Sequence, residues 1–339
     1  MESAHRGKQS IEFLHRPAIL SFASVAGKKE AHGPLANCFD IVSEDTTFGE
    51  KSWEKAETQM QKTALQLALD KAGMTEKDLD AAFVGDLLNQ CVGSSFSMRG
   101  NGIPTLGLYG ACSTMAESLL LAGMSISAGF CRRALALTSS HFASSERQYR
   151  FPLGYGGQRT PTAQWTVTGA GAVILGQTGN GPFLRNATIG TIVDRGIKDA
   201  NNMGAAMAPA AFETLRAHFD DLSLAPEDYD LIVTGDLGKL GHQIVNELFS
   251  REGVQLGTRY QDCGMMIFDL EKQDVHCGGS GCGCSASVLC GHLLGKMRRH
   301  ELTRLLFCGT GALLSPLTTQ QGESVPAVCH AVSIETERS

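Results

Sequence analysis

The sequence is poor in aromatic residues (6%), with only two tryptophans, and only 19% of its residues are charged. Its formal net charge is −6, so it lacks the excess of Lys and Arg that is typical of nucleic-acid-binding domains. It also lacks the run of about 20 apolar residues that a transmembrane helix needs, since the longest candidate, residues 119–130, is short and broken by Gly and Ser. These absences argue against a nucleic-acid partner and against an integral membrane protein.

The N-terminus lacks the pattern of a signal peptide, because residues 1–9 are polar and no apolar segment follows a basic start. We therefore expect a cytoplasmic protein whose 11 cysteines are free thiols in a reducing compartment. A chain of 339 residues can bury a large core and needs neither disulfides nor a metal ion to fold.

Glycine is the residue in excess, with 39 copies, well above the ~7% of an average protein. Glycines gather at residues 153–157, 169–181 and 278–283. Because glycine allows positive φ and close approach of the backbone, these clusters predict tight turns between strands and helices around a pocket.

A weak internal repeat relates residues 74–87 to residues 224–237, with no gap in the alignment. The two aspartates of the first copy, Asp78 and Asp80, match Asp228 and Asp230, and each copy then has a short apolar run that ends in Gly-Asp-Leu. Such a run predicts a buried strand. Helical patterns precede both copies, at residues 53–72 and 203–222.

The same order of elements follows in each half: a turn, a helix, basic residues and a buried strand. The first half has a helix at 113–129 and a strand at 134–138, and the second has a helix at 286–296 and a strand at 305–308. We therefore predict an α/β fold of two halves, residues 1–178 and 179–339, related by a pseudo-dyad and layered αβαβα. A chance match of one strand motif is the alternative.

Cys112 is the strongest candidate for a reactive side chain, because it lies after a predicted strand and just before a helix. The dipole and free N–H groups of a helix N-terminus can lower the pKa of a thiol and make a reactive thiolate. The alternative is a small buried apolar residue, which is a common role of cysteine.

Four stretches point to a known superfamily: residues 110–116, 169–176, 278–287 and 307–312. They resemble the thiolase superfamily, including β-ketoacyl synthase III-like condensing enzymes. The resemblance implies a thiolase-like fold with Cys112 at the position of the nucleophile, helped by a His and by a His or Asn. Here Asp236 stands where that His is expected, His242 follows inside the next helix, and Gly279 or Ser280 stands at the Asn position. These departures put condensation chemistry in doubt.

A closer resemblance covers nearly the whole chain and is carried by residues 39–57, 85–90, 109–118, 147–156, 158–169 and 198–209. In these stretches the sequence resembles the stage V sporulation protein AD family of endospore-forming bacteria. The resemblance implies binding of dipicolinic acid, free or as its calcium chelate. It also implies membership of a channel-like assembly with other stage V sporulation A membrane subunits, which moves this acid into the forespore and out during germination. The chain would then lie in the forespore, peripherally associated with the spore inner membrane.

Dipicolinate is a planar aromatic dianion, so its pocket needs hydrogen-bond donors for two carboxylates and a flat apolar wall. Helix N-termini near Cys112 and Ser280 offer backbone N–H groups. One loop also concentrates cations and aromatic rings that suit this ligand. The arginines are Arg147, Arg150 and Arg159, and the aromatic residues are Phe142, Tyr149, Phe151 and Tyr155.

Asp86 and Asp236 occupy equivalent places in the two halves, after buried strands, where they can orient Cys112 or a cation such as calcium. The alternative is an aspartate that caps a helix. His141 follows another strand and can reach a pocket at the dyad or lie capped at the surface. The Cys and His residues between 276 and 292 do not have the spacing of a zinc site, so we expect no metal and no cofactor.

The expected ligand-binding residues are therefore Asp86, Cys112, His141, Phe142, Arg147, Arg150, Tyr155, Asp236 and Ser280. Three functions stay open at this point. The first is non-enzymatic binding of dipicolinate, the second is acyl transfer by a Cys112 nucleophile, and the third is a scaffold that only docks membrane proteins. A homodimer that continues a sheet edge across its dyad is expected from the superfamily resemblance alone.

Overall fold

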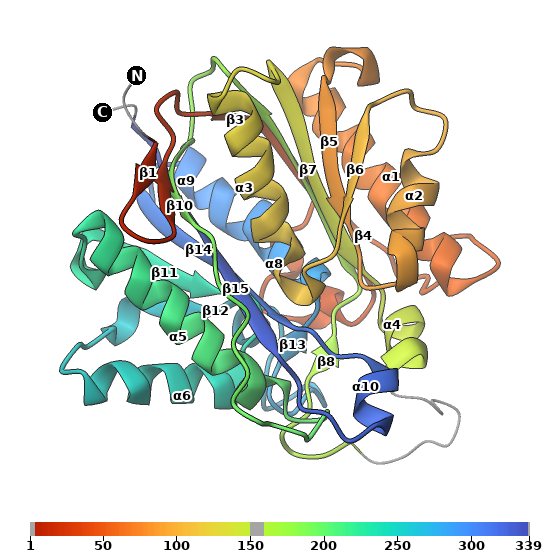
Figure 1. Cartoon of the computed structure of the whole chain (residues 1–339). Helices are drawn as coiled ribbons and strands as arrows, with labels where there is room; N and C mark the ends of the chain where they lie inside the picture. Colours follow the sequence, from red (N-terminus) through yellow and green to blue (C-terminus); the bar gives the residue numbers. More distant parts are fainter. Residues whose placement is uncertain (1–3, 150–158, 338–339) are drawn as a thin grey trace.

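The computed structural model describes residues 4–149 and 159–337. In this part of the chain, hydrogen bonds connect two arrays of strands into one continuous sheet (Figure 1). The first array consists of β3 (Ala18–Ala26), β9 (Gly169–Gly176), β7 (Arg133–Ser140), β5 (Ala81–Gly85) and β6 (Thr105–Leu108). The second consists of β10 (Phe183–Thr188), β15 (Ala327–Glu335), β14 (Arg304–Ala312), β11 (Leu231–Thr234) and β12 (Tyr260–Asp262).

The two arrays have the same topology. In the first, β9 pairs antiparallel with β3 and β7, and β5 pairs parallel with β7 and β6. In the second, β15 pairs antiparallel with β10 and β14, and β11 pairs parallel with β14 and β12. A single antiparallel pair, Phe183 with Ala18, joins the two arrays. This repeat of order and direction confirms the predicted α/β fold with two related halves, and the chain passes from one array to the other between Gly176 and Phe183.

The helices and short strands complete the fold. The helices are α1 (Trp53–Ala72), α2 (Val92–Met98), α3 (Thr114–Ser127), α4 (Phe142–Tyr149), α5 (Met203–Leu222), α6 (Gly238–Arg251), α7 (Cys263–Met266), α8 (Cys282–Val288), α9 (Leu294–Arg298) and α10 (Pro316–Gln320). The short strands are β1 (His5–Arg6), β2 (Ser10–Glu12), β4 (Ile41–Val42), β8 (Trp165–Thr166) and β13 (Gly279–Ser280).

Helices α1 and α5 have the predicted bounds, and local sequence explains both. Ser52 caps the start of α1 by accepting a hydrogen bond from the Lys55 N–H, and Gly73 ends the helix with φ of +63°. Asn202 caps the start of α5 in the same way. The helix predicted at 286–296 is longer, because α8 continues through a π-helical turn, Leu289–Leu293, into α9.

The helices and the two arrays form layers. One apolar core lies between the arrays and includes Leu119 of α3, Val288 of α8 and Phe307 of β14. A second core packs α1 against the outer face of the first array, and a third packs α5 and α6 against the second array. Figure 1 shows α3 and α8 between the arrays, with α1 on one outer side and α5 and α6 on the other. This is the predicted αβαβα layering.

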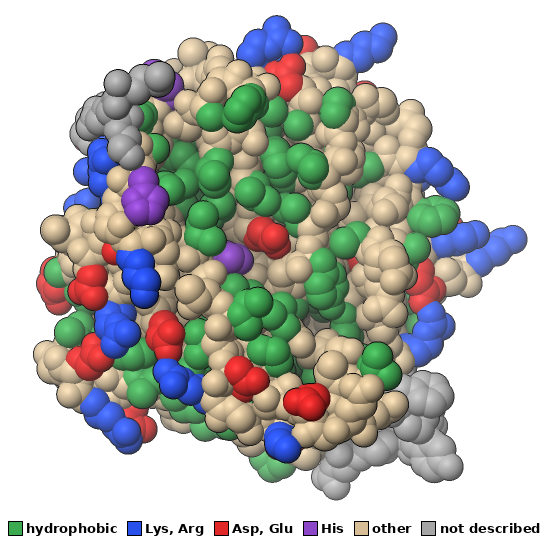
Figure 2. Space-filling model, viewed as in Figure 1, with side chains coloured by type: hydrophobic (Ala, Val, Ile, Leu, Met, Phe, Trp, Pro, Cys, Tyr) green, Lys and Arg blue, Asp and Glu red, His purple; other side chains and the backbone are tan. Residues whose placement is uncertain are grey.

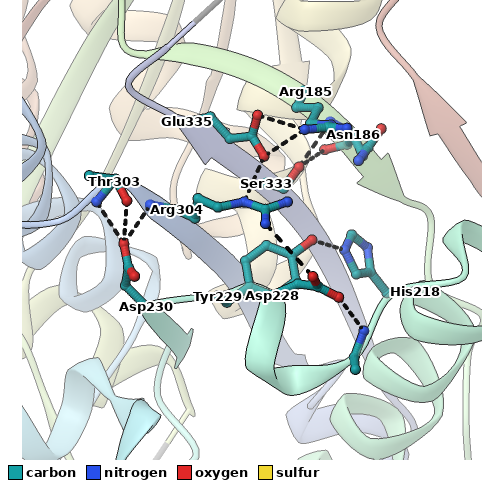
Figure 3. Close-up of polar contacts among 11 residues, drawn as sticks. Arg185, Asn186, His218, Asp228, Tyr229, Asp230, Thr303, Arg304, Ser333 and Glu335 are labelled. Atoms are coloured by element: carbon teal, nitrogen blue, oxygen red, sulfur yellow. Dashed lines mark hydrogen bonds and ion pairs between the residues drawn. The ribbon is translucent and has the colours of Figure 1, made fainter. Parts of the chain in front are cut away.

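The aspartates of the repeat have the same structural role in both halves. Asp80 accepts hydrogen bonds from the backbone N–H groups of Arg132 and Arg133, where β7 begins. Asp230 accepts from Thr303 and Arg304, where β14 begins (Figure 3). In each half, this aspartate therefore links the start of one strand, β5 or β11, to the start of the parallel strand beside it, β7 or β14.

Arg304 is the counterpart of Arg133, since Arg133 pairs with Asp78 at 3.4 Å and Arg304 with Asp228 at 3.8 Å. Arg304 and Arg185 also form ion pairs with Glu335, at 3.0 and 2.9 Å (Figure 3). These ion pairs link strands β14 and β10 to β15, which lies between them.

The face shown in Figure 2 has hydrophobic side chains in its middle and upper part, where α3 lies in Figure 1, and its Lys and Arg side chains stand mostly at the margins. None of the helices in the described ranges is both long and apolar enough to cross a membrane.

Candidate functional site

Cys112 lies in a turn between β6 and α3 and is 6% exposed. Ala111, the residue before it, has φ of +51°, a backbone conformation that is uncommon outside glycine. The turn is held from the other half of the molecule, because strand β14 passes it at very short range. A Cβ atom at Gly311 would lie 2.3 Å from the carbonyl oxygen of Gly110, so only glycine fits there. The Gly309-Thr310-Gly311 stretch thus positions the Cys112 turn.

Asp236 is the charged neighbour of the Cys112 thiol, and the two side chains interact electrostatically. Asp236 follows β11 and is fully buried. Its Oδ2 accepts from the Gly281 N–H at 2.8 Å and from the Ser280 hydroxyl at 3.3 Å, and its Oδ1 accepts from the Thr310 hydroxyl at 2.8 Å. The carboxylate is therefore held by three donors from two segments of the chain.

The electrostatics of this pair oppose thiolate formation. Burial, followed by the negative charge of Asp236, raises the pKa of the Cys112 thiol well above its ordinary value. Burial also raises the pKa of Asp236 to about 7. Of the two interpretations of Cys112 that the sequence left open, the raised pKa favours the buried thiol over the reactive thiolate. A nearby unit charge contributes about 4 kcal/mol at an effective dielectric constant of ~20, more than the ~0.3–2 kcal/mol of a helix dipole.

A cavity, which we call the Cys112 cavity, opens beside this thiol. Its enclosed volume is about 40 Å³, room for a water molecule or two, and the empty space up to and including its mouth is about 430 Å³. It is lined by Leu87, Tyr109, Ala111, Cys112, Ser145, Glu146, Tyr149, Thr166, Met203, Ser280, Ala312 and Leu314.

The polar atoms of the Cys112 cavity include one hydroxyl that stands out. The Ser145 Oγ is buried and has no hydrogen-bond partner within the described ranges. The Tyr109 and Tyr149 hydroxyls contact each other, and the Tyr149 hydroxyl also donates to the Leu87 carbonyl oxygen. The two tyrosine rings supply flat walls, and Ser145 supplies a donor for a ligand.

Two of the predicted site residues line this cavity, namely Cys112 and Ser280, and Asp236 contacts both. Asp86 does not line it. Its carboxylate is buried and accepts from the Leu88 N–H and from both the N–H and the hydroxyl of Ser94, which fastens α2. Of the two interpretations of Asp86, the structure therefore supports the capping role.

Three other predicted residues do not line the Cys112 cavity. The Arg147 guanidinium pairs with Glu54 and lies over the ring of Trp53. The Phe142 ring stacks on Trp165, with 3.9 Å between the centroids. His141 is buried, contacts the Thr46 carbonyl oxygen through Nε2 and accepts from a backbone N–H through Nδ1. Arg150 and Tyr155, which we also predicted, lie outside the described residues, as does Phe151.

Several residues of the site were missed by the sequence reasoning, among them Tyr109, Ser145 and Thr310. Thr310 lies inside the 307–312 stretch that carries the superfamily resemblance, so that stretch could have identified it. No comparable signal marks Ser145, whose hydroxyl reaches the cavity only because α4 packs beside β8.

The remaining cysteines give no sign of a metal centre. All 11 are free thiols, and nine of them are buried. Within residues 4–149 and 159–337, no group of three or more His, Cys, Asp and Glu residues could hold a metal ion. His242 lies in α6, stacked on Tyr260 with centroids 4.4 Å apart, and does not line the Cys112 cavity.

Comparison with known proteins places this geometry in context. A profile of the family described as "Stage V sporulation protein AD (SpoVAD)" matches residues 7–335. Stage V sporulation protein AD of Bacillus subtilis (strain 168) is 44% identical over 329 residues, which are 97% of each chain.

Solved structures of condensing enzymes share the fold. A variant of OleA from Xanthomonas campestris superposes with a TM-score of 0.60 at 13% identity, over 96% of this chain and 99% of the other. The 3-oxoacyl-[acyl-carrier-protein] synthase III of Aquifex aeolicus VF5 gives 0.56 at 13% identity, over 94% and 99%. These likenesses confirm the thiolase-like fold.

Proposed function

The chain belongs to the stage V sporulation protein AD family, and we propose that it binds dipicolinic acid without chemical turnover. Family membership supports a role in sporulation. In our proposal the protein is the ligand-binding subunit of an apparatus that moves this acid into the forespore and out again during germination. It would act beside membrane subunits, at the inner membrane of the spore.

This proposal rests on the Ser145 hydroxyl, which is buried in the Cys112 cavity and has no hydrogen-bond partner among the described residues. A buried hydroxyl without a partner costs about 1–3 kcal/mol, so a ligand that accepts its hydrogen bond recovers that energy on binding. The carboxylates of dipicolinate are such acceptors, and Tyr109 and Tyr149 supply flat walls for the pyridine ring. Because the enclosed part of the cavity is small, the ring would lie in its wider outer part.

The charge of the cavity favours the calcium chelate over the free dianion. Its ionisable lining includes the carboxyl group of Glu146, and Asp236 lies directly behind Ser280. A bare dianion would be repelled by these groups, whereas calcium neutralises the carboxylates of dipicolinate. The calcium ion would arrive with the ligand.

Calorimetry with dipicolinate, with and without calcium, tests the proposal. We expect saturable binding that is tighter with calcium, and Ser145→Ala should weaken it about tenfold while leaving the fold at least as stable. Ser125→Ala is the control, because Ser125 donates to a backbone carbonyl on α3 and does not line the cavity. Absence of binding, or equal affinity in both serine variants, would refute the site.

Acyl transfer by Cys112 is the competing function, and the raised pKa of the thiol argues against it. Incubation with radiolabelled acetyl-CoA should give no thioester on Cys112. A stable adduct that disappears in Cys112→Ala would overturn the proposal of binding without turnover. The scaffold hypothesis differs in another way, because it requires Ser145→Ala spores to contain normal amounts of dipicolinate.

We also propose that two copies of the chain associate through β6. This strand ends the sheet, and Leu106 on it is 54% exposed, with the exposed Phe96 and Tyr109 in the segments before and after it. An edge strand with exposed apolar side chains is a template for pairing with another chain. A dimer would then continue the sheet across its dyad.

A further inference from the structure

A second cavity, which we call the tryptophan cavity, lies beside Trp53 and Trp165, the two tryptophans of the chain. Its volume is about 480 Å³, within the range of small-molecule sites. Its lining residues are Lys28, Lys29, Glu30, His32, Thr46, Trp53, His141, Phe142, Ala143, Trp165 and Thr168.

None of the described residues lines both cavities, although the same two elements contribute to each. On β8, Trp165 lines the tryptophan cavity and Thr166 lines the Cys112 cavity. On α4, Phe142 and Ala143 line the first, and Ser145 lines the second. The tryptophan cavity is therefore a separate site.

Lys29 gives this cavity an anion-binding group. Its ammonium lies 3.9 Å from the centroid of the Trp165 ring and forms no hydrogen bond or ion pair with another residue of the described ranges. The guanidinium of Arg159 lies over the same ring at 4.7 Å, and Arg159 is paired with Asp274. Burial and the nearby Arg159 both lower the pKa of Lys29. Two cations over one ring repel each other, so an anion beside Lys29 would relieve this repulsion.

Glu30 is the second unusual group. Its side chain is 1% exposed, and its Oε1 accepts from the Thr168 N–H at 3.1 Å. Its Oε2 is buried without a hydrogen-bond partner within the described ranges. Burial raises the pKa of Glu30 to about 7, so the protonated acid is available as a donor near neutral pH. A ligand oxygen that accepts this proton in a hydrogen bond would give the Glu30 Oε2 a partner.

The remaining wall is apolar and aromatic. Phe142 stacks on Trp165 with an interplanar angle of 11°, and Trp53 lines the same cavity. His141 is fixed by its bonds to Thr46 and Ala143, and burial lowers its pKa, so it adds no charge near neutral pH. The cavity thus combines a flat apolar wall, an ammonium without a hydrogen-bond or ion-pair partner among the described residues, and one buried acid.

We propose that the tryptophan cavity binds a planar aromatic carboxylate. The carboxylate group would pair with the Lys29 ammonium, and the ring would pack between Trp53 and Phe142. The acid of Glu30 would donate to an oxygen of the ligand.

Intrinsic fluorescence tests this directly, because both tryptophans line the cavity. The probe is benzoate, which has one carboxylate and a flat ring, and benzamide is its neutral counterpart. We expect a saturable change in tryptophan fluorescence with benzoate, and at least tenfold weaker binding of benzamide. Trp53→Phe should retain the benzoate response through Trp165.

Two lysines, one inside the tryptophan cavity and one outside it, provide matched variants. Lys29→Gln should weaken benzoate binding about tenfold, since it removes a charge-assisted hydrogen bond. Lys77→Gln should stay within about twofold, because Lys77 is exposed and does not line the tryptophan cavity. Circular dichroism and thermal unfolding show whether both variants keep the fold.

Three outcomes would overturn the proposal: no saturable response to benzoate, equal affinity of the two lysine variants, or equal affinity for benzamide. None of these outcomes tests the dipicolinate proposal. That proposal is tested by the calcium dependence of the binding heat and by the affinity of the Ser145→Ala variant. A loss of dipicolinate binding in Lys29→Gln, with Ser145→Ala unchanged, would instead refute the Cys112 cavity as the dipicolinate site.

Discussion

Replacement of Asp236 by Asn should remove a defined part of the pH dependence of stability. Burial raises the pKa of this carboxyl to about 7, whereas an aspartate in an unfolded chain has a pKa near ~3.9. Between these two values the folded state binds more protons than the unfolded state. The free energy of unfolding contributed by Asp236 is therefore present at low pH and is lost as the pH rises through about 7.

The magnitude follows from the same two pKa values. At pH ~5 the folded carboxyl is protonated about two units below its pKa, which is worth about 3 kcal/mol at ~1.4 kcal/mol per unit. At pH ~8 both states are ionised and the contribution is close to zero. Asp236 should thus account for a loss of about 3 kcal/mol between pH ~5 and ~8, or about 4 °C in Tm for a chain of this size.

Urea unfolding at both pH values measures this loss. Wild type also contains Glu30 and Glu57, whose pKa values burial raises to about 7 and about 8, so its total loss exceeds that of Asp236 alone. Asp236→Asn should reduce the loss by about 3 kcal/mol, whatever its stability at a single pH.

Asp80→Asn provides the control. The hydrogen bond from Arg132 lowers the pKa of Asp80 to about 2, so this group is ionised in both states throughout the range. Its replacement should leave the wild-type pH dependence unchanged. An Asp236→Asn protein with the full wild-type loss, or an Asp80→Asn protein with a reduced one, would refute the account of the Asp236 environment.

Three further predictions concern the turn, the thiol and the sheet edge. Iodoacetamide should alkylate Cys112 at least about 100-fold more slowly in the folded chain than in urea, and Asp236→Asn should accelerate the folded-state reaction, as followed by peptide mass spectrometry. Gly311→Ala should destabilise the fold by about 2 kcal/mol or more in urea unfolding, because its Cβ would meet a backbone oxygen, whereas Gly295→Ala in α9 should cost nothing. Leu106→Arg should shift the chain to monomer in analytical ultracentrifugation, whereas the same change at Phe130, an 84% exposed residue outside the sheet edge, should not.

Much of the fold could be predicted because its signals are local. The bounds of α1 and α5 follow from their caps and apolar spacing, and the repeated Asp80 and Asp230 mark equivalent strand starts. A local signal of this kind needs no knowledge of what packs against it.

The candidate site was predicted less completely, because long-range contacts decide its chemistry. The helix N-terminus at Cys112 is visible in the sequence, but the buried charge of Asp236, which outweighs it, comes from the other half of the chain. The same holds for Phe142, which local reasoning placed beside dipicolinate and which stacks on Trp165 instead. Side-chain direction at the end of a strand depends on what packs there, and sequence spacing does not contain that information.

If the chain binds its ligand without turnover, as proposed, the surroundings of Asp236 account for a condensing-enzyme fold that keeps its cysteine without its chemistry. Transfer of the Cys112 proton to Asp236 is unfavourable, because the pKa of the thiol is raised well above its ordinary value while that of the carboxyl is about 7. Three donors also fix this carboxylate in place. In the proposed function, Cys112 is thus a wall of the cavity, and Asp236 keeps it in its thiol form. The turn, the Gly311 contact and the cavity would be retained because they shape a binding site. Selection for binding would then preserve the same backbone that catalysis requires, while the groups that activate a nucleophile are lost.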